Sequence, residues 1–195
     1  MHKRILTVLS LACTFLVSQA QSAPEGLFIN SKAPDFRTKT QSGTEIHLKD
    51  LLKKGKVVIL FYRGNWSPDC IRELSHFADS LHFITDKGAS VLAISPEQPE
   101  QVAKTIEQSK AGFPLISDEG LKIMKAYDVA FEIPENTVTR YRNSNIDIEK
   151  INGKNGKFLP VPAVFVIDKE SNIIFRFFET DYKKRPSVAQ ILENL

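Results

Sequence analysis

The sequence predicts an α/β domain in which helices cover both faces of a central sheet. Residues 57–62 and 90–95 form two short apolar runs rich in β-branched side chains, as in strands that are buried on both faces. After the first run, apolar residues recur every three or four positions, which predicts an amphipathic helix from about Pro68 to Asp86. This alternation of strands and helices is typical of a parallel sheet with crossover helices.

The other elements follow from turn residues and local patterning. Alternating residues on either side of Ser42 and Gly43 predict an N-terminal β-hairpin. Strands over residues 163–167 and 173–178 are joined by a short turn, so the second is expected to return antiparallel and make the sheet mixed. The remaining expected elements are a helix over 48–54, a helix opened by Pro96 and Glu97 that ends near Lys110, a strand over 113–117, a helix capped by Asp118 that ends near Tyr127, and a closing helix over 188–195.

Residues 131–159 interrupt this alternation. The segment is polar and carries clusters of asparagine, serine and glycine at 143–145, 152–153 and 155–156. Such a composition is typical of loops, so we expect a loop-rich insertion with one helix around residues 135–142. The insertion is expected to belong to a single domain that spans residues 27–195.

The first 20 residues have the pattern of a secretory signal peptide. A basic start at Lys3 and Arg4 precedes an apolar stretch over residues 5–17, and Ser18-Gln19-Ala20 places small residues where a signal peptidase cleaves. We therefore expect cleavage after Ala20, a linker over residues 21–26, and export to the periplasm or the extracellular space. The alternative is an uncleaved membrane anchor.

Cleavage would change both the charge and the cysteine count. It lowers the number of basic residues from 26 to 24, against 23 acidic ones, so the mature chain offers no basic surplus for nucleic acid or for stable contact with an anionic membrane. It also removes Cys13 and leaves Cys70 as the one cysteine, which cannot form an internal disulfide and is either buried or reactive. His47, His76 and His82 lack the spacing of metal ligands, so no metal site is expected.

Cys70 is expected in the first turn of its helix. Ser67 is a suitable N-cap and Pro68 suits the first helical position, which makes Cys70 the third helical residue. A thiolate there meets free backbone N–H groups and the positive end of the helix dipole, and Arg63 and Arg72 are close enough in sequence to add positive charge. The alternative is that Cys70 is a small buried apolar residue on the inner face of the helix.

Four segments in order resemble one known family: APDF at 33–36, VVILFYRGNWSPDC at 57–70, VPAVFVID at 161–168, and DYKKRPSVAQILENL at 181–195. Together they resemble thioredoxin-fold proteins of the peroxiredoxin-like group related to alkyl hydroperoxide reductase and thiol-specific antioxidant proteins (AhpC/TSA). The resemblance implies a thioredoxin-like fold, with a redox-active cysteine at the start of the first long helix.

Three positions depart from the patterns of this group. Ser67 replaces the first cysteine of a W-C-x-x-C dithiol, although Ser67 and Cys70 fit the T/S-x-x-C pattern of peroxiredoxins. Arg63 stands where the peroxiredoxin motif opens with proline. Pro162 stands where peroxiredoxins carry an arginine, and it matches instead the cis-proline that faces the thioredoxin active site. Arg63 is a candidate to replace the missing charge.

The resemblance implies a thiol-dependent peroxidase without a cofactor. Cys70 would attack a hydroperoxide and become a sulfenic acid, Ser67 would hydrogen-bond the thiolate or the peroxide, and an external thiol or a thioredoxin-like reductant would regenerate the enzyme. Trp66, Pro68 and Pro162 are expected around the substrate pocket, with Trp66 mainly a packing residue. The basic run at 183–185 is interpreted as a solvated turn.

Two other functions stay open at this point. A thiol-disulfide oxidoreductase would suit the thioredoxin-like features, but Ser67 replaces the sulfur that attacks substrate disulfides. A thioredoxin-fold binding module without catalytic activity would suit the loss of that cysteine and of the peroxiredoxin arginine. The sequence does not determine the oligomeric state.

Overall fold

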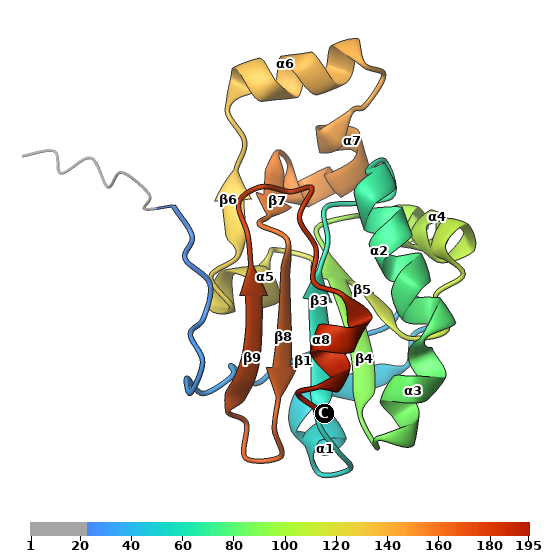
Figure 1. The fold of residues 1–195 in the computed structure, drawn as a ribbon. Helices are drawn as coiled ribbons and strands as arrows, with labels where there is room; N and C mark the ends of the chain where they lie inside the picture. The colour runs from blue at the N-terminus through green and yellow to red at the C-terminus, as the bar shows by residue number, and fades with distance from the viewer. Residues whose placement is uncertain (1–22) are drawn as a thin grey trace, which may run out of the picture.

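The computed structural model describes residues 23–195, and its main feature is a five-stranded mixed sheet (Figure 1). The expected signal peptide, with Cys13, lies outside the described residues. The strands are ordered β5-β4-β3-β8-β9, and their bounds are β3 Val57–Phe61, β4 Ser90–Ser95, β5 Leu115–Ser117, β8 Ala163–Ile167 and β9 Ile173–Phe178. β3, β4 and β5 run parallel, whereas β8 and β9 are antiparallel to their neighbours. The predicted mixed sheet is confirmed.

β3 lies at the centre of the sheet, and all five of its residues are buried. Because successive side chains of a strand point to opposite faces, Val57, Ile59 and Phe61 enter one core while Val58 and Leu60 enter the other. This explains why the run is apolar throughout rather than alternating.

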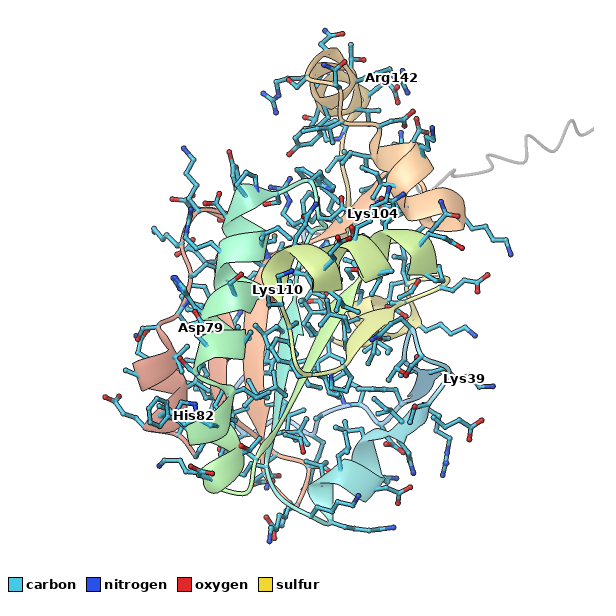
Figure 2. The ribbon with its side chains drawn as sticks, turned by 90° about the vertical axis from the view of Figure 1, so that its right-hand side faces the viewer. Lys39, Asp79, His82, Lys104, Lys110 and Arg142 are labelled. Carbon is cyan, nitrogen blue, oxygen red and sulfur yellow. The ribbon has the colours of Figure 1, made fainter. Side chains whose placement is uncertain are left out.

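Helices cover both faces of the sheet, as predicted. On one side, α1 (Leu48–Leu52) and α5 (Lys122–Ala126) contribute buried residues to the core. On the other side lie α2 (Pro68–Asp79), α3 (Leu81–Asp86), α4 (Pro99–Ser109) and α8 (Val188–Leu192). Figure 2 shows α2 and α4 side by side on this second face, with Asp79, Lys104 and Lys110 at its surface. The N-terminal hairpin is also present, as β1 (Arg37–Lys39) and β2 (Glu45–His47).

The single helix expected over residues 68–86 is two helices, so that prediction is wrong. Ser80 has φ −102° and ψ 6°, which ends α2, and α3 begins at the next residue. Phe77 and Ile84 are nevertheless both buried in the same core. The apolar repeat therefore continues across the break, and periodicity alone could not reveal it.

Two other helices start later than expected. α4 begins at Pro99 rather than at Pro96, because Glu97 turns into the core and is fully buried. α5 begins at Lys122, although the carboxylate of Asp118 still accepts hydrogen bonds from the N–H groups of Ile123 and Met124.

The insertion over residues 131–159 is more regular than the loop-rich segment that we expected. It contains α6 (Glu135–Asn143), α7 (Ile148–Asn152) and the short 3₁₀ helix η1 (Gly153–Asn155), and the antiparallel strands β6 (Ala130–Glu132) and β7 (Phe158–Pro160) join it to the domain. The insertion has a small core of its own, formed by Ile133, Val138, Ile148 and Leu159. Figure 1 shows it above the end of the sheet where β3 leads into α2. Within residues 23–195, no helix is long and apolar enough to cross a membrane.

Candidate active site

Cys70 lies in the first turn of α2, where the sequence placed it. The hydroxyl of Ser67 caps this helix by accepting a hydrogen bond from the backbone N–H of Cys70, at 3.4 Å. Pro68 occupies the first turn and is itself exposed. Cys70 is completely buried, and the backbone N–H of Arg63 points at its sulfur, at 3.4 Å. Ser67 thus bonds the backbone and not the thiol in this structure.

An arginine that the sequence analysis assigned to a solvated turn lies against the sulfur. Nη2 of Arg185 is 3.7 Å from Sγ of Cys70, and Nε of Arg185 is 2.7 Å from Oε2 of Glu73. The side chain of Arg185 is largely buried, and the carbonyl oxygens of Tyr182 and Lys184 accept hydrogen bonds from its Nη1. The interpretation of residues 183–185 as a solvated turn is therefore wrong for Arg185.

Glu73 completes a buried group of three side chains with Cys70 and Arg185. It lies one helical turn after Cys70, so both residues face the same way from α2. Burial raises the pKa of Glu73 to about 7; the charge of Arg185 and its hydrogen bond to Glu73 oppose this rise, and Asp69 adds to it. Glu73 and Cys70 keep the pKa of Arg185 above its ordinary value, although burial acts against its charge. The group therefore holds a permanent cation beside the sulfur and a carboxyl that titrates near neutral pH.

The two arginines that the sequence placed near Cys70 have other partners. The guanidinium of Arg63 donates a hydrogen bond to the hydroxyl of Tyr141, and the rings of Tyr182, Trp66 and Tyr141 surround it at 4.7, 5.0 and 5.8 Å. Arg72 forms an exposed ion pair with Asp69. Arg63 therefore contacts the sulfur through its backbone, while the nearby guanidinium belongs to Arg185.

Trp66 belongs to the turn that precedes α2 and packs against the insertion. Its ring lies 5.0 Å from that of Tyr141 in an edge-on arrangement, and it packs against the small core of the insertion. The insertion therefore contributes an aromatic side chain next to the candidate site.

Pro162 differs from the expectation in its backbone geometry. No cis peptide bond occurs within residues 23–195, so the predicted cis-proline is wrong. Pro162 lines a cavity of about 560 Å³ together with Arg63 and Tyr182, whereas Trp66 and Pro68 do not line it. Of the three predicted pocket residues, only Pro162 therefore lines this cavity.

A buried carboxylate supports the turn between β3 and α2. Oε1 of Glu97 accepts a hydrogen bond of 2.7 Å from the backbone N–H of Asn65, and Oε2 accepts one of 2.9 Å from the hydroxyl of Thr105. Burial raises the pKa of Glu97, and these hydrogen bonds oppose the rise. This role of Glu97 could not be recognised in the sequence, where Pro96 and Glu97 have the pattern of a helix start.

The comparisons with known proteins show one family and two kinds of relative. A model of the AhpC/TSA family matches residues 29–176. The chain is similar to a putative peroxiredoxin Bcp of Helicobacter pylori (38% identical over 103 residues, 53% of this chain and 67% of the relative) and to the peroxiredoxin Bcp of Bacillus subtilis (29% over 168 residues, 86% and 94%). It is also similar to the thiol-disulfide oxidoreductase ResA of Bacillus cereus (27% over 172 residues, 87% and 82%).

Solved structures confirm the fold. The crystal structure of the peroxidoxin BcpB from Mycobacterium tuberculosis matches with a TM-score of 0.65 at 24% identity, over 85% of this chain and 94% of that one. A yeast mitochondrial 1-Cys peroxiredoxin matches with a TM-score of 0.65 at 23% identity, over 85% and 73%. The predicted thioredoxin-like fold is therefore confirmed.

Proposed function

The chain belongs to the AhpC/TSA family of thiol-dependent peroxidases and oxidoreductases, and from this premise we propose that it is a one-cysteine peroxidase acting through Cys70. Its substrates would be hydrogen peroxide or organic hydroperoxides. The observation that carries the proposal is the guanidinium of Arg185, 3.7 Å from the sulfur of Cys70. A permanent cation at this distance stabilises a thiolate, and it can also stabilise the negative charge that develops on the peroxide.

The proposed reaction has two stages. In the first, the Cys70 thiolate attacks the terminal oxygen of the hydroperoxide, so that an S–O bond forms as the O–O bond breaks, and the departing oxygen takes up a proton to give water or an alcohol. In the second, an external thiol attacks the sulfenic acid and releases water, and a second thiol then displaces Cys70 from the mixed disulfide. External thiols are needed because Cys70 has no second cysteine within residues 23–195.

Peroxide consumption with dithiothreitol or glutathione as reductant tests this proposal directly. We expect the purified protein to turn over and Cys70→Ser to be inactive. A dimedone-type probe should trap one sulfenic acid, on Cys70, after stoichiometric peroxide. If Cys70 of the folded protein stays unmodified after prolonged exposure to peroxide, the proposal is wrong and a binding module becomes the better interpretation.

A thiol-disulfide oxidoreductase is the second candidate, because the likeness to ResA covers 87% of the chain. Ser67 weighs against it, because Ser67 occupies the position of the first cysteine of a dithiol motif, whose sulfur attacks substrate disulfides. Insulin reduction in the presence of dithiothreitol distinguishes the two functions, since only the second candidate predicts it.

We also propose that the protein is exported, on the pattern of residues 1–20 alone. N-terminal sequencing of the protein purified from its host should then find Gln21 as the first residue.

A further inference from the structure

Arg63 carries a buried charge that has no acidic partner in the described part of the chain. Only 5% of this residue is exposed. The arginine ion pairs within residues 23–195 belong to Arg72, Arg142 and Arg185, and residues 1–22 contain no aspartate or glutamate that could supply a partner. Because a buried charge is costly unless it is paired, this guanidinium is a candidate site for an anion.

The neighbours of Arg63 satisfy its charge only in part. The rings of Tyr182, Trp66 and Tyr141 lie 4.7–5.8 Å from the guanidinium carbon and offer cation–π stabilisation. Aromatic faces do not replace acceptors in the plane of the guanidinium, where its N–H groups point. Nη2 has the hydroxyl of Tyr141, but Nε is buried without a hydrogen-bond partner among residues 23–195. An acceptor is therefore missing.

Arg63 lines a cavity of about 560 Å³ whose other walls are mostly apolar. The wall residues come from the segment before the hairpin, from β6, from the end of β7 and from the loop after β9: Ala23, Pro24, Ala130, Phe131, Glu132, Pro160, Val161, Pro162, Thr180 and Tyr182. This volume suits a small organic molecule with a hydrocarbon part and one polar end. Arg63 links this cavity to the candidate site, because it lines the cavity while its backbone N–H points at the sulfur of Cys70.

We propose that this cavity binds an amphipathic monocarboxylate, such as a medium-chain fatty acid. Its carboxylate would pair with the guanidinium of Arg63, which offers N–H donors in the geometry that a carboxylate matches. Its hydrocarbon part would lie against Phe131, Pro160 and Val161. The one acidic wall residue, Glu132, does not prevent this, because its side chain is exposed and its carboxylate pairs with Lys157 at 3.2 Å.

Titration of decanoate and of decanol into the purified protein tests the proposal without any assay of peroxidase activity. The two ligands share a chain and differ in the charged end, so decanoate is expected to bind at least about tenfold more tightly. Trp66 is the one tryptophan of the sequence and lies against Arg63, so its fluorescence should change with occupancy. Equal affinity for the two ligands, or no binding of decanoate in the millimolar range, would overturn the proposal.

Variants show which arginine is responsible for the preference for decanoate over decanol. Arg63→Gln should lose the preference for decanoate, and Arg63→Lys should keep part of it. Arg72→Gln is the matched control, since Arg72 is an exposed arginine of the same region that is already paired with Asp69, and it should bind decanoate as the parent does. If the control loses the preference and Arg63→Gln keeps it, the site is elsewhere. The comparison of decanoate with decanol on the unmodified protein decides the matter even if Arg63→Gln fails to fold.

Discussion

Arg185 and Cys70 lie 115 positions apart in the chain, yet Nη2 of Arg185 is 3.7 Å from the sulfur of Cys70. Three local features produce this contact. Cys70 is held at the start of α2, Glu73 lies one turn further along and anchors Nε of Arg185, and two carbonyls of the loop before α8 bind its Nη1. The positive charge beside Cys70, which was expected from Arg63, thus comes from Arg185 in the C-terminal segment.

Replacement of Arg185 should impair the peroxidase more than it impairs folding at neutral pH. We expect Arg185→Gln to lower kcat/KM for hydrogen peroxide by roughly a hundredfold, because it removes a charged donor aimed at the reacting atoms. Arg185→Lys should retain more activity but cannot bond Glu73 and Cys70 with the same fork. Stopped-flow measurement of sulfenate formation provides the rate.

Lys184→Gln is the control for this series. Lys184 neighbours Arg185, but its side chain is exposed and pairs with Glu179. Lys184→Gln should leave the rate of sulfenate formation within about twofold of the parent, as expected for an exposed ion pair. A loss in this control as large as that in Arg185→Gln would show that the loop, and not the guanidinium, is responsible.

Stability should fall as pH rises from about 5 to 8, with Glu73 as a main cause. Its pKa is about 7 in the folded protein, above the ordinary value of 4.5, so the folded state binds more protons than the unfolded state between these values. The free energy of unfolding therefore decreases with pH across this window, by roughly 2–3 kcal/mol for Glu73. Urea unfolding at several pH values measures the slope.

Burial also raises the pKa values of Glu97 and Asp118, which therefore add to the slope in the same direction. Glu73→Gln isolates the contribution of Glu73, because this variant keeps the shape of the side chain and removes the titration. Its slope should be shallower than that of the parent. Parallel pH profiles for the two proteins would contradict the assignment of the shift to Glu73.

Loss of the helix cap should cost stability and also disturb the site. Ser67→Ala removes the acceptor for the N–H of Cys70 and should destabilise the protein by about 1 kcal/mol. Asp147→Ala is a matched control, since Asp147 caps α7 in the insertion by accepting from the N–H of Lys150. The two variants should lose similar stability in urea, but only Ser67→Ala should slow sulfenate formation. Equal slowing in both would indicate a general loss of folded protein.

The elements that could be predicted from the sequence are those specified by nearby residues. The apolar run of β3 identified the central strand, and Ser67 with Pro68 located the start of α2 within one residue. The contact of Arg185 with Cys70 could not be predicted in this way, because it depends on how a distant loop packs. One signal was available: Glu73 follows Cys70 by three positions on a buried helical face, and a buried carboxylate requires a donor.

The regular structure of the insertion could not be predicted from local sequence patterns either. Its asparagine and glycine clusters indicated loops, yet Asn152 and Asn155 are buried and bond backbone carbonyls, so these residues support a compact unit. Its core of four apolar residues is too sparse to give a visible repeat. The aromatic neighbours of Arg63 could not be predicted either, because Tyr141 and Tyr182 are both far from residue 63 in the sequence, one in the insertion and the other in the loop after β9.

The last prediction concerns the position of the missing cysteine. Ser67→Cys should create a C-x-x-C dithiol at the start of α2, since residue 67 caps the helix and Cys70 lies in its first turn. In such a pair the first sulfur attacks a disulfide and the second resolves the mixed disulfide. We therefore expect the variant to form an internal disulfide with Cys70 on oxidation, and to reduce insulin with dithiothreitol, which the parent should not do.

Mass spectrometry after mild oxidation detects this internal disulfide as the loss of two hydrogens, and Ser67→Cys combined with Cys70→Ser is the control that cannot form it. The same bond should compete with sulfenate, so a dimedone-type probe should label the variant less than the parent. A variant that forms no internal disulfide would show that these two positions lack the geometry of a dithiol motif, and the assignment of Ser67 to the lost cysteine would then be wrong.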